Sequence, residues 1–249
     1  MSSTNYAFIS NYAVYSAIAL FTVAFFAHAI EVAFSLRNSG DKTKFDFTRT
    51  KRSGDLGTVM VVLAFICLLV AVVSRGISAE RVPWGNMYEF SITGALAFTG
   101  AYIFALWKYK IRWLGLPVAI SVLLTLGTAI TVLYVPSAPL VPALKSAWLV
   151  IHVSAAIISG GVFLLANCIA ATYLILDRYE ENGGRPVWAL KLPTLEALDQ
   201  LSYRLVALVF PLWTFSVIAG AIWAEAAWGR YWGWDPKETS LFWIPSPIS

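Results

Sequence analysis

The segment from Trp228 to Glu238, WGRYWGWDPKE, has the composition of a binding surface for a flat apolar ligand. It holds three of the chain's 11 tryptophans, and each indole gives an apolar wall with one N–H donor. Gly229 and Gly233 leave space between the rings, and Asp235-Pro236 is a turn signal that ends a helix. An interfacial aromatic belt, which explains tryptophans elsewhere in the chain, needs neither the glycines nor this turn.

Charged residues and a histidine narrow the choice of ligand. Arg230 and Lys237 can meet carboxylates at the edge of a planar molecule, so haem is one of several aromatic ligands that fit. Of the 2 histidines, His152 lies near the outer end of the apolar run Ala147–Leu176, level with the tryptophan segment. It is a candidate axial ligand, because neutral imidazole commonly binds haem iron. A structural hydrogen bond is the alternative role for His152. We interpret His28, which lies beside Glu31, as a hydrogen-bonded or helix-packing residue.

Glu89 in the stretch WGNMYEF lies at the start of an apolar run, where an ionisable side chain costs free energy unless it has a partner. We expect it to pair with Arg81 or Lys237, or to orient a ligand. Asn86 and Tyr88 are further hydrogen-bonding groups in the same stretch.

The composition indicates that most of the chain is solvated by lipid. Apolar residues make up 59% and charged residues 13%, with a mean hydropathy of +0.70, whereas a soluble domain carries about 25% charge. Six runs of 18 or more mostly apolar residues are long enough to cross a membrane as helices. A β-barrel would instead show short segments of alternating hydrophobicity. The fold is therefore predicted to be all-α and polytopic, with about six transmembrane helices: Tyr12–Leu36, Leu56–Val73, Phe90–Trp107, Leu114–Tyr134, Ala147–Leu176 and Val206–Ala224.

The distribution of Lys and Arg predicts the orientation. Thirteen of the 18 lie in three segments: Arg37–Asp55, the turn at 108–112 and Asp177–Leu205. If the chain crosses the membrane six times, these three segments lie on the same side. The positive-inside rule makes that side the cytoplasm, so both termini face outward from the plasma membrane. The net charge of +4 reflects this bias and gives no reason to expect a nucleic-acid partner.

The predicted organisation is a single membrane domain over residues 1–249. The tryptophan-rich segment 223–239 faces outward. Residues 193–205 have leucines at helical spacing and read as a short amphipathic helix on the cytoplasmic surface, capped by Thr194. Cys67 and Cys168 fall inside spans, and without a C-x-x-C motif they read as small apolar side chains.

Three motifs together resemble a known family. The pattern W-G-x-x-W-x-W-D-P-K-E resembles the tryptophan-rich WWD domain of membrane haem-handling proteins. The stretches PWGNMYEF and WLVIHVSAA are similar to cytochrome c biogenesis proteins of the CcsA/ResC type, often called CcsB in actinobacteria. The resemblance extends over essentially the whole chain.

The resemblance implies a function in system II cytochrome c maturation. Such proteins work with a ResB-type membrane partner, present haem b at the outer face, and allow its vinyl groups to join the thiols of apocytochrome c. A thioredoxin-like thiol reductant is a further expected partner. Trp228, Trp232, Trp234 and Asp235 match the WWD pattern, and His152 matches the first outward axial histidine.

The sequence also departs from the family. The family continues into a further span with a histidine and then a second outward histidine, whereas no histidine follows His152 in this chain. We expect either a C-terminally truncated copy or a second ligand from another chain. The chain reads as a component of a cytochrome c synthase that is not active alone, because no nucleophile and base are arranged for catalysis.

Two other classes of function fit parts of the pattern. A small-solute transporter or channel would use the aromatic segment as an outer gate, but transporters place polar groups near the midplane, where this chain has few. A structural subunit of a membrane complex would use the tryptophans as interface anchors. A haem chaperone or lyase of another WWD family would differ mainly in its partners.

Overall fold

The computed structural model describes residues 3–37, 44–109, 111–137, 146–185, 189 and 192–233. Within these ranges the chain is helical and contains no strand, and six helices are long and apolar enough to cross a membrane. The prediction of an all-α, multi-pass membrane protein is thus confirmed. The elements are α1 (Ser3–Arg37), α2 (Lys44–Ala79), α3 (Met87–Lys108), the short 3-10 helix η1 (Arg112–Leu114), α4 (Gly115–Thr131), α5 (Ala147–Glu181) and α6 (Leu195–Trp228).

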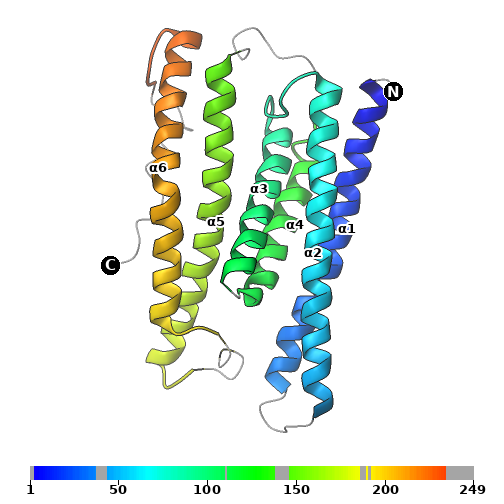
Figure 1. Cartoon of the computed structure of the whole chain (residues 1–249), viewed down its shortest axis with the longest axis vertical. Helices are drawn as coiled ribbons and strands as arrows, with labels where there is room; N and C mark the ends of the chain where they lie inside the picture. Colours follow the sequence, from blue (N-terminus) through cyan, green and yellow to red (C-terminus); the bar gives the residue numbers. More distant parts are fainter. Residues whose placement is uncertain are drawn as a thin grey trace.

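Successive membrane-spanning helices run in opposite directions along the long axis of the molecule (Figure 1). The start of α1, the α2–α3 connection and the end of α6 therefore lie at one end, which we call the tryptophan end. The other end carries Lys51, Arg112 and Arg178, and we call it the basic end. Residues from the three basic segments thus share one end, as the sequence predicts.

The helices form two groups. Helices α1 to α4 pack around one another, whereas α6 packs mainly on α5, and α5 joins the groups by packing on α3 (Figure 1). The contact between α5 and α3 needs a glycine, since a Cβ at Gly161 would lie 2.8 Å from the backbone nitrogen of Phe98. Small residues of this kind allow helix backbones to approach closely in membranes.

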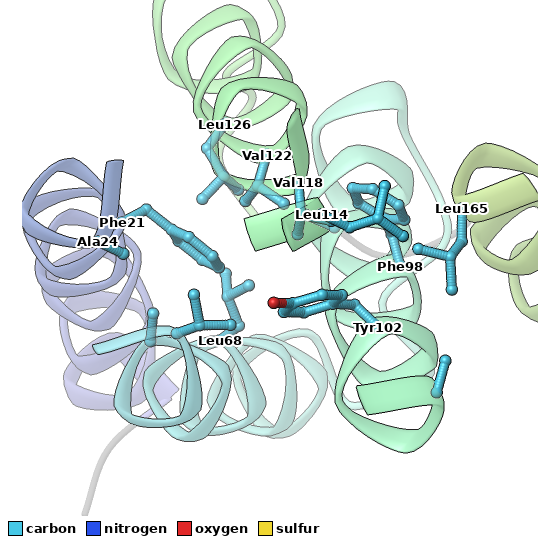
Figure 2. Close-up of a cluster of buried hydrophobic side chains, with 14 of the residues drawn as sticks. Phe21, Ala24, Leu68, Phe98, Tyr102, Leu114, Val118, Val122, Leu126 and Leu165 are labelled. Carbon is cyan, nitrogen blue, oxygen red and sulfur yellow. The ribbon is translucent and has the colours of Figure 1, made fainter. Parts of the chain in front are cut away.

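The shared core is a layer of large apolar side chains between α1 and α4. Phe21 of α1, Leu68 of α2 and Tyr102 of α3 point toward one another, with Val122 of α4 above them (Figure 2). All four are fully buried. By contrast, only 22–39% of the most apolar window in each span is buried, so the remaining apolar faces are suited to lipid.

The segment 193–205 differs from its predicted form. Thr194 caps the helix as expected, because its Oγ1 accepts a hydrogen bond from the backbone nitrogen of Ala197 at 3.3 Å. The residues after it, however, are the first turns of α6 and not a separate surface helix. Leu198 is fully buried and Leu205 is 8% exposed. No Gly or Pro lies between residues 195 and 210, and the helix continues past Leu205 and through Pro211. The leucine spacing therefore packs this part of α6 against the bundle.

The basic end is held together by a polar network that includes His28. His28 Nδ1 lies 3.2 Å from Glu31 Oε2 on α1, and Glu31 Oε1 pairs with Arg112 Nη2 at 2.9 Å. Arg112 Nη1 also bonds Asp55 Oδ1 of α2 at 2.7 Å. The network therefore links α1, α2 and η1 at the basic end of the bundle.

The imidazole of His28 fits between two glycines. A Cβ at Gly57 would lie 2.7 Å from His28 Nε2, and a Cβ at Gly115 would lie 2.4 Å from the same atom. Both ring nitrogens thus face protein, one toward Glu31 and the other toward α2 and α4. This geometry confirms the interpretation of His28 as a hydrogen-bonded, helix-packing residue.

We predict that Gly115→Ala lowers the free energy of unfolding by about 1–3 kcal/mol, because the new methyl overlaps a buried imidazole. Gly127→Ala in the same helix is the matched control, since a Cβ there has nothing within 4 Å. Thermal unfolding of the two variants in detergent measures the difference. Equal stability would show that His28 does not fill the Gly115 notch.

Candidate functional site

At the tryptophan end, α6 is terminated by a glycine. The helix ends at Trp228, and Gly229 follows in the left-handed conformation with φ 68°, donating its backbone N–H to Glu225 O at 2.8 Å. Glycine adopts this conformation without the strain that a Cβ would cause. The turn then directs the chain away from the helix axis, so the residues that follow lie beside the end of α6.

Two tryptophans pack edge to face at this helix end. The rings of Trp223 and Trp228 have centroids 6.3 Å apart and an interplanar angle of 82°. Trp228 is 60% exposed, whereas Trp223 is partly buried and its Nε1 has no hydrogen-bond partner among the described residues. The pair therefore has one exposed indole ring, Trp228, packed on an indole whose N–H is buried.

The described part of the predicted segment 223–239 ends at residue 233. Trp232 is partly buried, and a Cβ at Gly233 would lie 2.5 Å from Arg230 Cζ. Trp234, Asp235 and Lys237 lie outside the described residues. The structure thus places Trp228 and Trp232 near the end of α6, and the assignment of all four residues to the ligand site stays a prediction.

His152 lies in the second turn of α5 and faces α6. Its Nδ1 is 2.7 Å from the backbone oxygen of Ser216 and 3.3 Å from Ser216 Oγ, and the same hydroxyl donates to His152 O at 3.1 Å. A carbonyl only accepts hydrogen bonds, so Nδ1 carries the proton. In the neutral imidazole the lone pair is therefore on Nε2, which is the atom available to a metal.

The depth of His152 differs from its predicted level. The residue lies at the tryptophan end, as expected, but its ring lies against Gly220 of α6. At 1.5 Å per residue, Gly220 is about 12 Å below Trp228 along the helix. Trp223 lies between the two levels on α6, three residues from Gly220.

Sequence reasoning did not identify Trp223, Ser216 or Gly220 individually. They follow one another at intervals of four and three residues, which places them on one face of α6. A serine and a glycine at this spacing in an apolar run are typical of a helix–helix contact. The pattern indicates that a partner is near but does not say that the partner is His152.

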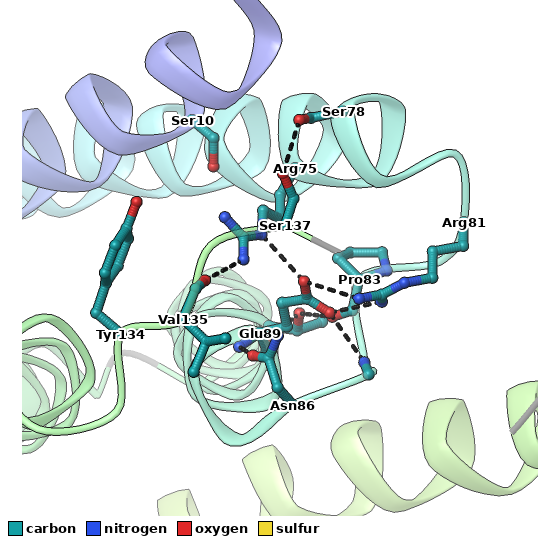
Figure 3. Close-up of polar contacts among 12 residues, drawn as sticks. Ser10, Arg75, Ser78, Arg81, Pro83, Asn86, Glu89, Tyr134, Val135 and Ser137 are labelled. Atoms are coloured by element: carbon teal, nitrogen blue, oxygen red, sulfur yellow. Dashed lines mark hydrogen bonds and ion pairs between the residues drawn. The ribbon is translucent and has the colours of Figure 1, made fainter. Parts of the chain in front are cut away.

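Glu89 is the centre of a second polar cluster at the tryptophan end (Figure 3). Its carboxylate accepts hydrogen bonds from Arg75 Nε at 3.0 Å, from Arg81 Nη1 at 2.7 Å and from the backbone nitrogen of Gly85 at 2.9 Å. Glu89 and Arg75 are both fully buried. The predicted pairing with Arg81 is confirmed, whereas Lys237 lies outside the described residues.

Arg75 was missed by the sequence reasoning, although it connects the cluster to the α4 end. Its Nη2 donates to Val135 O at 2.5 Å, and its guanidinium lies 5.2 Å from the centre of the Tyr88 ring. The Tyr88 ring in turn packs edge to face on Tyr134. The cluster therefore ties α2, α3 and the segment after α4 into one unit.

Asn86 and Tyr88 have structural roles in this cluster. Asn86 Oδ1 accepts from the backbone nitrogen of Glu89 at 2.9 Å and so caps α3. Tyr88 is 1% exposed beneath Arg75. The hydrogen-bonding groups of the stretch WGNMYEF are thus used to fix the α2–α3 connection at the tryptophan end.

We predict that Glu89→Gln lowers the free energy of unfolding by about 3–5 kcal/mol, because it leaves a buried guanidinium without its carboxylate. Glu80→Gln removes a carboxylate from the same connection but at an exposed position, and should change stability by less than about 0.5 kcal/mol. Thermal unfolding in detergent compares the two. A Glu89→Gln protein as stable as Glu80→Gln would mean that the cluster does not hold the connection.

A comparison with protein families finds a match over most of the chain. Residues 84–244 match the family model described as cytochrome C assembly protein. The matched range includes Glu89, His152 and Trp228, whereas Arg75 and Arg81, which pair with Glu89, precede it.

Named relatives agree with this match. The chain is 31% identical over 223 residues to the cytochrome c biogenesis protein CcsA of Trieres chinensis, covering 78% of this chain and 72% of that protein. The corresponding proteins of Picosynechococcus sp. and Microcystis aeruginosa are 32% and 33% identical, each over 74% of this chain and 71% and 70% of their own lengths.

Proposed function

Because this chain belongs to the cytochrome c assembly protein family, and so acts in cytochrome c biogenesis, we propose that it binds haem b at the extracytoplasmic face and presents it to apocytochrome c. The observation that carries the proposal is the placement of His152 and the Trp223–Trp228 pair at one end of the bundle, opposite the basic end. Haem is then the cargo that the chain positions, and not a resident cofactor.

The tautomer of His152, with its proton on Nδ1, supports a role as axial ligand. Ligating histidines commonly donate their second ring nitrogen to a carbonyl or carboxylate, which fixes the tautomer and the ring plane. The 2.7 Å contact between Nδ1 and Ser216 O provides such a bond. His152 Nε2 is then the atom that binds the iron, while His28, enclosed at the other end of the bundle, has no part in the site.

The tryptophans are suited to the macrocycle. Trp228 presents an exposed ring, Trp232 lies in the turn that follows, and Trp234 and Asp235 extend the segment in sequence. Burial of a large apolar face contributes about 25 cal/mol per Å². We propose that these indoles supply most of the affinity and that His152 supplies the orientation.

The orientation of the bundle follows the positive-inside rule. In this orientation the end that carries Lys51, Arg112 and Arg178 faces the cytoplasm, and the tryptophan end faces outward. Haem at the tryptophan end would then meet apocytochrome c, whose thiols are joined outside the cytoplasm.

The chain acts in this proposal as one component of a synthase. A ResB-type membrane partner completes the complex, and a thioredoxin-like reductant keeps the thiols of the apocytochrome reduced. The reacting thiols belong to the apocytochrome, so this chain contributes proximity and orientation, which lower the barrier without a catalytic nucleophile. Since His28 is enclosed by Gly57 and Gly115 beside the Arg112 network, a second axial histidine would come from outside these 249 residues.

We predict that the purified complex shows a haem Soret band that His152→Gly weakens and that added imidazole partly restores. The reason is that free imidazole can enter the space left by the missing ring and bind the iron. His28→Gln is the control and should leave the band unchanged. A spectrum that is the same before and after His152→Gly would remove His152 as the ligand.

We predict that Trp228→Ala or Trp232→Ala lowers haem occupancy of the complex by at least about tenfold, the effect of about 1.4 kcal/mol in binding. Trp107→Ala is the matched control, because Trp107 is 83% exposed at the end of α3 nearest the basic end. Haem titration followed by absorbance measures all three. If the Trp107 variant loses as much haem as the others, the segment is an ordinary aromatic belt.

A further inference from the structure

The contact between His152 and α6 depends on a gap in the side-chain layer of α6. A Cβ built on Gly220 would lie 2.7 Å from both Cε1 and Nδ1 of His152. Real carbon atoms do not approach this closely, so the imidazole occupies space that every residue except glycine would fill. Gly220 thus determines whether the ring can reach α6 at all.

The same gap exposes the hydrogen-bond acceptor. Ser216 is four residues before Gly220, so its carbonyl points along the helix toward the Gly220 backbone. With no side chain on Gly220, the ring edge reaches this carbonyl and Nδ1 donates to it at 2.7 Å. Ser216 Oγ reinforces the contact by donating to His152 O at 3.1 Å.

Three properties of His152 follow from these two residues. The carbonyl of Ser216 fixes the proton on Nδ1, the absence of a Cβ at Gly220 fixes the plane of the ring, and the pairing of α5 with α6 fixes its depth. Each property is one that an axial ligand needs before the iron arrives, because preorganisation removes the cost of ordering the ring during binding.

We infer that Ser216 and Gly220 are positioning residues that hold the His152 imidazole with its Nε2 directed to the haem iron. The inference rests on the proposed function, since it assigns α6 the task of preparing the ligand on α5. It extends the haem site from the tryptophan segment down to the middle of α6. Neither residue touches the haem, and both act through the imidazole.

The inference predicts that Gly220→Ala weakens haem binding by about 10- to 100-fold, the usual effect of losing the partner of a metal-ligating histidine. Gly160→Ala on α5 is the matched control, since a Cβ there has nothing within 4 Å. Ser216→Ala keeps the carbonyl and should retain haem affinity within about threefold, well short of the loss on removing the ring contact. Haem titration of the purified complex measures these changes.

A double-mutant cycle separates positioning from general damage to the fold. In a His152→Gly background with imidazole added, Gly220→Ala should no longer weaken haem binding, because free imidazole orients itself and does not meet the new methyl. If Gly220→Ala weakens binding equally in both backgrounds, the glycine acts through helix packing and the inference is wrong.

The outcomes distinguish this inference from the proposed function. If His152→Gly leaves haem binding unchanged, the role of His152 as ligand fails and the positioning role fails with it. If His152→Gly abolishes binding while Gly220→Ala does not change it, the ligand stands and only the positioning role is overturned. The position of the Soret band in Gly220→Ala adds a second readout, which should shift when the ring plane changes.

Discussion

The structure depends on one constraint, which is that a backbone in hydrocarbon must form its hydrogen bonds within its own segment. Each apolar run therefore becomes a complete helix, and successive helices must return across the membrane. This alternation brings Arg75, Glu89, His152 and Trp228 to one end of the bundle, although they are far apart in the sequence. The candidate site is a consequence of that topology, since no single segment contains all of its parts.

Within this frame the chain places polar side chains in notches that glycines leave open. His28 lies against Gly57 and Gly115, Glu31 lies where a Cβ on Gly54 would be, and His152 lies against Gly220. A polar group in a membrane protein needs a partner, and a missing Cβ lets it reach one on the next helix. The notches make the polar networks part of helix packing, so that the bundle and the site are specified by the same contacts.

The two histidines differ in how the neighbouring glycines surround the ring nitrogens. At His28, which is 1% exposed, Glu31 meets Nδ1 and two glycines enclose Nε2, which has no hydrogen-bond partner among the described residues. At His152 a single glycine contacts the Nδ1 edge of the ring, and the Ser216 carbonyl accepts a hydrogen bond from Nδ1. His28 Nε2 is enclosed between two helices, whereas His152 meets a glycine on one side only, so we propose His152 and not His28 as the haem-binding residue.

Sequence reasoning predicted what hydropathy and charge determine. Local composition was enough to predict the six spans, the shared end of the basic segments and the Thr194 cap. The pairing of Glu89 with Arg81 followed from the need of a buried carboxylate for a partner. Sequence reasoning did not find Arg75, Ser216 or Gly220, because their roles depend on how neighbouring helices are rotated and in register. It also separated 193–205 from α6, since an amphipathic pattern does not show whether a helix continues into the membrane.

Pulsed electron paramagnetic resonance of the oxidised haem complex, with all histidines labelled with nitrogen-15, tests the central claim most directly. The account predicts a coupling between the iron and a labelled imidazole nitrogen that persists in His28→Gln and is lost in His152→Gly. A coupling that survives unchanged in His152→Gly would show that another residue holds the iron, and the account would be wrong.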